Sequence, residues 1–279
     1  MAHNPKRLSR LRAVMGEQGI DVLYVRELSN ISWATGFERV FDDEPAHALV
    51  VSARNCVLHT DSRYFDAMKS AAADADIEVD NSRMAHSAVL AQVSDCIDGD
   101  IVRVGIEDSM PLAEYRALQR TFEGRAIDLV ELSGFVEELR QVKDESEITA
   151  MRKAQSITDA AFANIIAFMK PGMTEREVQI ELEDFMVRHG AEGLAFPSIV
   201  ACGANGASPH SVPGATKLEA GQCVVMDFGA RAQGYCSDMT RTVFLGEPSE
   251  RLRAGYAAIR DANEQVEAVL RPGMTGKEA

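Results

Sequence analysis

Two aspartates, Asp227 and Asp238, are the residues whose type and spacing most directly suggest chemistry. They lie on either side of a natural turn, 231–234, in segments rich in β-forming residues, so a hairpin is expected. Pairing of Ala230 with Tyr235 would set the two aspartates directly opposite each other, with Cβ atoms about 4.5–5.5 Å apart. Carboxylates at that distance repel, and a divalent cation between them removes the repulsion. The spacing therefore predicts a dinuclear hydrolase site, whose oxygen ligands suit ions such as Mn²⁺.

Thr240 and His210 are the other candidates for this site. Thr240 is expected on the same face as Asp238, where it can donate a hydrogen bond to a metal ligand. His210 precedes the hairpin in a loop stiffened by Pro209 and Pro213, from which it could reach the same cleft. The alternatives are that the aspartates are solvated strand residues and that the histidine is a surface residue. The remaining histidines are treated as structural: His3, His47, His59, His86 and His189.

The elements that must position these residues form a second region, which begins near Val142. Asp144 and Glu147 fit a capping signal in front of a long amphipathic helix, and Thr174 with Glu177 fits a capping box in front of another. The expected helices of this region are 145–169, 175–189 and 250–270, and the expected strands are 198–202, 222–230 and 234–245.

The first region alternates helical and strand patterns and is expected to be an α/β domain. Nothing in it has catalytic spacing. Because 279 residues exceed the size of one ordinary core, we expect two domains, 1–138 and 139–279. In the first domain we expect a helix that ends near Gly19, helices at 63–73 and 111–122, strands at 21–26 and 102–107, and a hairpin of 47–52 with 56–60.

One segment of the second region is repeated. The sequence KPGMTEREV at 170–178 recurs as RPGMTGKEA at 271–279, and each copy follows a long helical pattern. The match indicates duplication of a unit made of helix, turn, helix and sheet. In the second copy, Thr275 and Glu278 repeat the helix-start signal with no helix after it. We therefore expect these residues to be a C-terminally truncated chain.

The composition excludes several classes of protein. Hydrophobic residues make up 46% and charged residues 26%, which is typical of a soluble globular chain. A net charge of −14 makes nucleic acid and anionic membrane poor partners. The amino terminus is charged throughout, unlike a signal peptide, and no window is apolar enough to span a bilayer. Five cysteines without a CxxC pair favour reduced thiols and a cytoplasmic location.

The motifs of the second region resemble a known superfamily. The stretch 142–245 resembles the catalytic domain of the creatinase, prolidase and methionine-aminopeptidase superfamily in VKDESEITAMRKA, KPGMTEREV, AFPSIVACGANGASPHSVP, LEAGQCVVMDFGA and GYCSDMTRTVFLGEP. The first region is similar to the amino-terminal domain of aminopeptidase P and prolidase enzymes in GIDVLYVRELSNISWATGF and HTDSRY. Methionine aminopeptidases lack that domain, so the resemblance favours the Xaa-Pro peptidases.

The resemblance implies an α/β amino-terminal domain followed by an α+β pita-bread catalytic domain, here with an incomplete second half. It implies an Xaa-Pro peptidase in which two divalent ions activate a water, with Mn²⁺ expected and Co²⁺ or Zn²⁺ as alternatives. Asp227 and Asp238 match two metal ligands of the family, and His210 matches a substrate-side histidine that steadies the tetrahedral intermediate. The implied partners are small peptides with proline at the second position and, at full length, a second copy of the chain.

The family also requires one more histidine and two glutamates farther along the chain. This sequence has no histidine after His210, and its later acidic residues fall on a loop or on expected helices. We therefore expect the chain as given to be inactive alone. Two alternatives remain. A metal-independent creatinase-like amidinohydrolase does not need the aspartate pair, and a non-catalytic peptide-binding module suits the missing ligands but not the intact pair.

Overall fold

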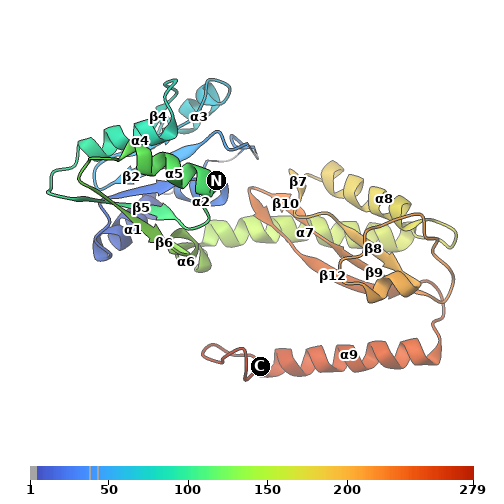
Figure 1. Cartoon of the computed structure of the whole chain (residues 1–279). Coiled ribbons are helices and arrows are strands. Elements are labelled where there is room, and N and C mark those ends of the chain that lie inside the picture. The colour runs from blue at the N-terminus through green and yellow to red at the C-terminus, as the bar shows by residue number, and fades with distance from the viewer. Residues whose placement is uncertain (1–4, 38, 43) are drawn as a thin grey trace. The chain divides into compact units, whose positions relative to one another are not determined.

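The computed structural model describes residues 5–37, 39–42 and 44–279 of the chain (Figure 1). An α/β region comes first, and a region of helices and antiparallel strands follows it. Within the described residues, no helix is both long enough and apolar enough to cross a membrane.

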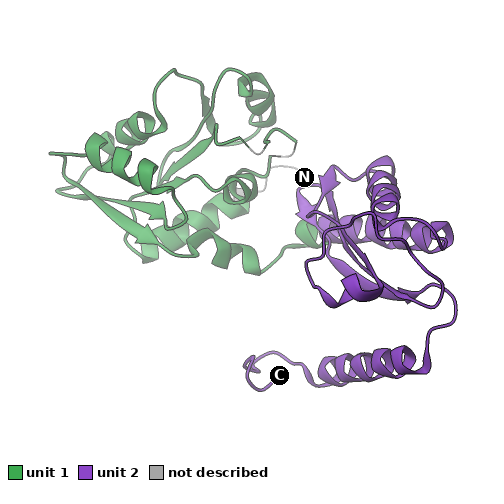
Figure 2. Cartoon of the chain, turned by 45° about the vertical axis from the view of Figure 1, so that its right-hand side comes forward, with its two compact units in different colours: residues 1–148 green, residues 149–279 purple. Residues whose placement is uncertain are grey.

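The contacts divide the chain into two units, 1–148 and 149–279 (Figure 2). The division falls inside helix α7 (Glu145–Phe168), which begins in the first unit and continues into the second. The boundary expected from the sequence, 138–139, lies in the preceding helix, α6 (Phe135–Gln141). The difference arises because the first turn of α7 packs with the first unit.

The first unit is built on a six-stranded mixed sheet with the strand order β4-β3-β2-β1-β5-β6. Its strands are β1 (Val22–Val25), β2 (Ala48–Ser52), β3 (Cys56–His59), β4 (Glu78–Asp80), β5 (Val102–Glu107) and β6 (Ile127–Leu132). The central strand, β1, pairs antiparallel with β2 and parallel with β5. The hairpin expected around 53–55 is confirmed by the antiparallel pairing of β2 with β3.

Helices cover both faces of this sheet. They are α1 (Pro5–Glu17), α2 (Leu28–Thr35), α3 (Phe65–Ala71), α4 (His86–Asp95) and α5 (Leu112–Thr121), together with α6. On β1, Leu23 and Val25 share a core with α1, α2, α3 and α6, whereas Val22 and Tyr24 share a core with α4 and α5. A strand buried on both faces is apolar at successive positions, which explains the unbroken run VLYV.

The second unit packs α7 and α8 (Glu175–Arg188) against antiparallel strands. Two three-stranded sheets have the orders β11-β10-β7 and β12-β9-β8. The strands are β7 (Gly193–Leu194), β8 (Ile199–Cys202), β9 (Cys223–Phe228), β10 (Ala230–Ala232), β11 (Tyr235–Cys236) and β12 (Met239–Phe244), and a short 3₁₀ helix, η1 (Gly203–Ala207), follows β8. The last helix, α9 (Glu250–Val269), has no buried residue.

The long elements agree with the sequence, and several short ones do not. The expected helices 145–169 and 175–189 are confirmed as α7 and α8. The two long strands expected at 222–230 and 234–245 are each divided, into β9 with β10 and into β11 with β12. The sequence analysis did not predict α2, α4, α6, β4, β6 and β7. Of these, α2, α6, β4 and β7 have eight residues or fewer, too few for a clear periodic pattern.

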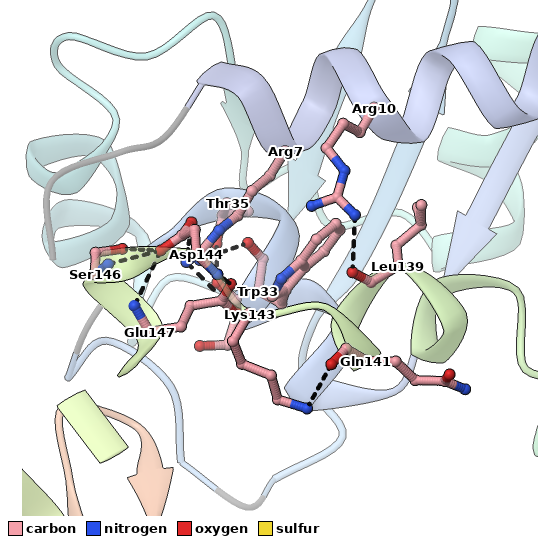
Figure 3. Close-up of polar contacts among 11 residues, drawn as sticks. Arg7, Arg10, Trp33, Thr35, Leu139, Gln141, Lys143, Asp144, Ser146 and Glu147 are labelled. Atoms are coloured by element: carbon pink, nitrogen blue, oxygen red, sulfur yellow. Dashed lines mark hydrogen bonds and ion pairs between the residues drawn. The ribbon is translucent and has the colours of Figure 1, made fainter. Parts of the chain in front are cut away.

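A buried arginine on α1 holds the start of α7 (Figure 3). The guanidinium of Arg7 donates hydrogen bonds to the carbonyl of Trp33, at 3.2 Å, and to Asp144 Oδ2, at 3.3 Å. It also lies 3.7 Å from the buried carboxylate of Glu147. Asp144 and Glu147 form the predicted capping box, in which each side chain accepts from the backbone N–H of the other. Burial acts to raise the pKa of Asp144, but hydrogen bonds from Ser146 and from Glu147 N–H, with the charge of Arg7, lower it to about 2.

Replacing Arg7 tests how much its buried contacts with Asp144 and Glu147, here called the buried clamp, contribute to stability. The substitution Arg7→Met removes the guanidinium that lies 3.7 Å from the buried carboxylate of Glu147. Because loss of one member of a buried ion pair is strongly destabilising, we expect the free energy of unfolding to fall by about 3–5 kcal/mol. Urea unfolding measures the change. The matched control is Arg63→Met, because Arg63 pairs with Glu44 and Asp61 on the surface, where a loss of about 0–1 kcal/mol is expected. Equal losses in the two variants would contradict the buried clamp.

Candidate functional site

Asp227 lies on the central strand of the sheet β12-β9-β8. Its neighbours in sequence, Met226 and Phe228, are fully buried in the core that the strand forms with α7 and α8. Since successive side chains of a strand point to opposite faces, the half-buried Asp227 belongs to the face turned away from these helices. Ile199 of β8 and Thr240 of β12 pair with it on either side.

Thr240 fixes the carboxylate of Asp227. Its hydroxyl donates a hydrogen bond of 2.8 Å to Asp227 Oδ1. In the part of the chain that the structure describes, no hydrogen-bond donor contacts the other oxygen, Oδ2. A carboxylate with one oxygen held and one oxygen open is suited to bind a cation, and the hydroxyl would orient it. The sequence placed Thr240 beside the aspartates, and the structure identifies Asp227 as its partner.

The predicted pairing of Asp227 with Asp238 is wrong. We expected a turn over 231–234, but the turn consists of Gln233 and Gly234 alone, whose φ angles are +52° and +74°. Positive φ at both positions is the signature of a type I′ turn, whose twist matches that of the flanking strands. This shorter turn moves the register by two residues, so Thr240 stands opposite Asp227.

Asp238 lies one step beyond this ladder. The pairs Arg231 with Cys236 and Met239 with Phe228 share one register, which sets Asp238 across from Gly229. It is therefore a diagonal neighbour of Asp227, and diagonal neighbours have Cα atoms about 7–8 Å apart. Because Asp238 precedes Thr240 by two residues, strand alternation favours the same face for both. Asp238 is exposed, in the short break between β11 and β12.

A buried polar contact fixes the backbone just before Asp238. The hydroxyls of Thr158 on α7 and of Ser237 lie 2.6 Å apart, and both accept from the N–H of Ala230, at 3.1 and 2.9 Å. The Ser237 backbone passes so close to Gly229 that a Cβ there would lie 1.9 Å from the Ser237 carbonyl oxygen. Only glycine fits at this crossing, and the tight approach explains why neither long strand is continuous.

His210 lies in the loop that follows η1, and its side chain is exposed. The loop leaves β8 at Cys202, which pairs with Val224 at the far end of β9 from Asp227. The structure brings the loop back to the start of α8, where Arg176 N–H donates to the Gly214 carbonyl. A shared cleft for the histidine and the aspartates stays a prediction.

The ligand set in this chain is small. In the residues that the structure describes, no three His, Cys, Asp or Glu side chains gather to hold a metal ion. Asp227 and Asp238 offer carboxylate oxygens, the donor type that Mn²⁺ and similar ions accept. The open oxygen of Asp227 fits a cation, so the residues present are compatible with part of a metal centre.

Comparison with known proteins defines the family. A model of metallopeptidase family M24 matches residues 149–279, and a model of the creatinase/prolidase N-terminal domain matches residues 7–142. An uncharacterised peptidase of Bacillus subtilis (strain 168) is 36% identical over 276 residues, which cover 98% of this chain and 74% of the relative. A relative named Xaa-Pro dipeptidase from Lactobacillus delbrueckii subsp. lactis is 30% identical over 97% of this chain and 74% of its own length.

Solved structures agree with this assignment. The Xaa-Pro dipeptidase from Bacillus anthracis superposes with a TM-score of 0.86 at 33% identity, over 98% of this chain and 74% of that one. The X-Pro aminopeptidase from Thermotoga maritima MSB8 gives 0.81 at 30% identity, over 97% and 74%. The chain belongs to the M24 metallopeptidases, with a creatinase/prolidase-type amino-terminal domain and a catalytic domain of the pita-bread fold.

Sequence reasoning missed the residues that position the site. The sequence analysis did not select Gly229, Ser237 or Thr158 as candidates. Gly229 and Ser237 nevertheless lie within the quoted motifs, in MDFGA and YCSDMT. A buried hydroxyl pair leaves no periodic pattern, because one partner comes from α7 and the other from the segment between β11 and β12, far apart in sequence. Glu175 was also missed, as it stands inside the capping signal of Thr174.

Substituting Gly229 tests the backbone crossing. In Gly229→Ala the new Cβ meets the Ser237 carbonyl oxygen at 1.9 Å and Ala195 Cβ at 3.0 Å, so we expect a loss of about 1–3 kcal/mol or more. Thermal unfolding measures it. Gly255→Ala is the control, since nothing lies within 4 Å of its Cβ position in α9 and alanine is favoured in a helix by about 1 kcal/mol. A Gly229→Ala protein as stable as wild type would refute the close approach.

Proposed function

We propose that this chain carries part of the active site of a metal-dependent Xaa-Pro peptidase, which cleaves the bond before a proline at the second position of a peptide. The observation that carries the proposal is the carboxylate of Asp227, held by Thr240 at 2.8 Å with its other oxygen open. The names of the relatives, Xaa-Pro dipeptidase and X-Pro aminopeptidase, support the choice of substrate.

Each site residue has a proposed role. Asp227 and Asp238 hold two divalent ions, Mn²⁺ by preference, and Thr240 orients the first carboxylate. Such ions lower the pKa of a bound water and polarise the scissile carbonyl. His210 donates a hydrogen bond to the carbonyl oxygen of the substrate as negative charge develops on that oxygen. We further propose a cytoplasmic location and a homodimer.

Two other functions fit less well. A creatinase-like amidinohydrolase without metal gives no role to the Asp227 carboxylate that Thr240 holds, or to the second carboxylate, Asp238, that we propose beside it. A non-catalytic peptide-binding module on the same fold gives no reason for the Thr240–Asp227 hydrogen bond. The aspartate face therefore favours the peptidase, and metal binding distinguishes it from both alternatives.

The metal site is tested by titration calorimetry with Mn²⁺. We expect weak binding to residues 1–279, because only two ligands are proposed here, and no turnover of Xaa-Pro peptides. The substitution Thr240→Val frees the Asp227 carboxylate and should weaken binding by about 10-fold or more, as loss of an orienting partner does. Thr242→Val, two residues along the same strand, should leave it unchanged. Tight binding of two ions with turnover would show that the proposed ligand set is incomplete.

The catalytic roles are tested in a fusion protein that joins these residues to the part of the Bacillus subtilis relative that they do not match. We expect metal-dependent release of the residue before proline. Asp238→Ala should abolish it, and His210→Ala should lower kcat by about 100-fold or more, because the histidine acts in the transition state. Unchanged turnover in His210→Ala removes that residue from the mechanism.

A further inference from the structure

A fully buried carboxylate lies beneath the loop that carries His210. Glu175 is the first residue of α8 and is 0% exposed. Its Oε1 accepts hydrogen bonds from the N–H of Cys202, at 2.8 Å, and from Asn205 Nδ2, at 2.9 Å. Its Oε2 accepts from the N–H of Gly214, at 3.2 Å. One carboxylate thus receives three donors from a single loop.

These donors lie at the two ends of the loop. Cys202 is the last residue of β8, and Asn205 lies in η1, so both precede His210. Gly214 follows it. The carboxylate therefore fixes where the loop departs and where it returns, and the segment between contains the histidine.

The backbone of α8 strengthens the same connection. The first N–H groups of a helix have no partner within the helix. Here Glu175 N–H donates to the Thr216 carbonyl, at 3.0 Å, and Arg176 N–H donates to the Gly214 carbonyl, at 3.1 Å. The loop carbonyls therefore satisfy the free N–H groups at the start of α8. A negative charge at this end of a helix is also electrostatically favoured.

Three hydrogen-bond donors around Glu175 favour its ionised form. Burial acts to raise the pKa of Glu175, but hydrogen bonds from Cys202 N–H, Asn205 and Gly214 N–H outweigh it and lower the pKa. The ionised carboxylate can accept from all three donors at once. A glutamine amide would offer one acceptor oxygen and would turn an NH₂ group towards an N–H, leaving a donor unsatisfied.

We propose that Glu175 is the positioning residue for His210: its carboxylate ties both ends of the 202–214 loop to the start of α8 and so sets where the imidazole lies. The assignment rests on the proposed function of His210 in the peptidase site. Glu175 itself touches no substrate, and it acts through the loop.

The test uses residues 1–279 without metal, labelled for NMR at the backbone and at the histidine rings, in wild type, Glu175→Gln and Glu177→Gln. Glu177→Gln is the matched control, because it removes the same charge from the same helix turn and glutamine still serves in a capping box. In Glu175→Gln we expect the Gly214 amide to exchange with solvent at least about tenfold faster, from loss of a charged acceptor. We also expect the His210 ring signal to broaden or split. In Glu177→Gln, the Gly214 amide exchange rate and the His210 ring signal should be the same as in wild type.

The outcomes separate positioning from plain stability. A lower unfolding temperature in Glu175→Gln with a wild-type His210 ring signal would overturn the proposal, as would equal ring changes in the two variants. If Glu175→Gln does not fold, Asn205→Ala decides, since it removes one donor and should change the His210 signal in the same direction by less. A separate Mn²⁺ titration of wild type tests the metal site. Its failure would overturn the proposed function without changing the metal-free comparison.

Discussion

The two-residue turn at Gln233 and Gly234 determines which side chains lie beside Asp227. Because register in a hairpin follows from turn length, the type I′ turn aligns Thr240 with Asp227 and moves Asp238 to the diagonal. A turn of four residues would instead have placed the carboxylates face to face. The diagonal placement leaves more room between the two carboxylates. Thr240 occupies the position opposite Asp227, and its hydroxyl orients the Asp227 carboxylate.

Buried polar contacts between helices and loops carry out the remaining positioning. Thr158 of α7 holds the backbone ahead of Asp238, and Glu175 of α8 holds the loop of His210. Arg7 holds the start of α7 through Glu147. Each contact joins segments distant in sequence, and removal of one partner of a buried polar contact is more destabilising than removal of a surface one. The proposed site therefore depends on helices that contribute no residue to it.

The sequence predicted the long helices α7 and α8, because amphipathic periodicity and capping boxes are local signals. Both capping boxes form as expected, at Asp144 with Glu147 and at Thr174 with Glu177. The register around Asp227 was not predictable with the same ease, since Ala-Gln-Gly-Tyr allows more than one turn length. Contacts such as that of Glu175 with Gly214 depend on tertiary packing, and no local pattern indicates them.

We propose that Asp227, Thr240 and Asp238 together form a cation-binding face. Paramagnetic Mn²⁺ broadens NMR signals of nearby nuclei even when it binds weakly, so the most direct measurement is a Mn²⁺ titration of the labelled chain followed residue by residue. We expect the amide signals of Asp227, Asp238 and Thr240 to broaden first, and this broadening to disappear in an Asp227→Asn, Asp238→Asn double variant. Broadening centred on another acidic surface, such as that of Glu177 and Glu181 on α8, would contradict it.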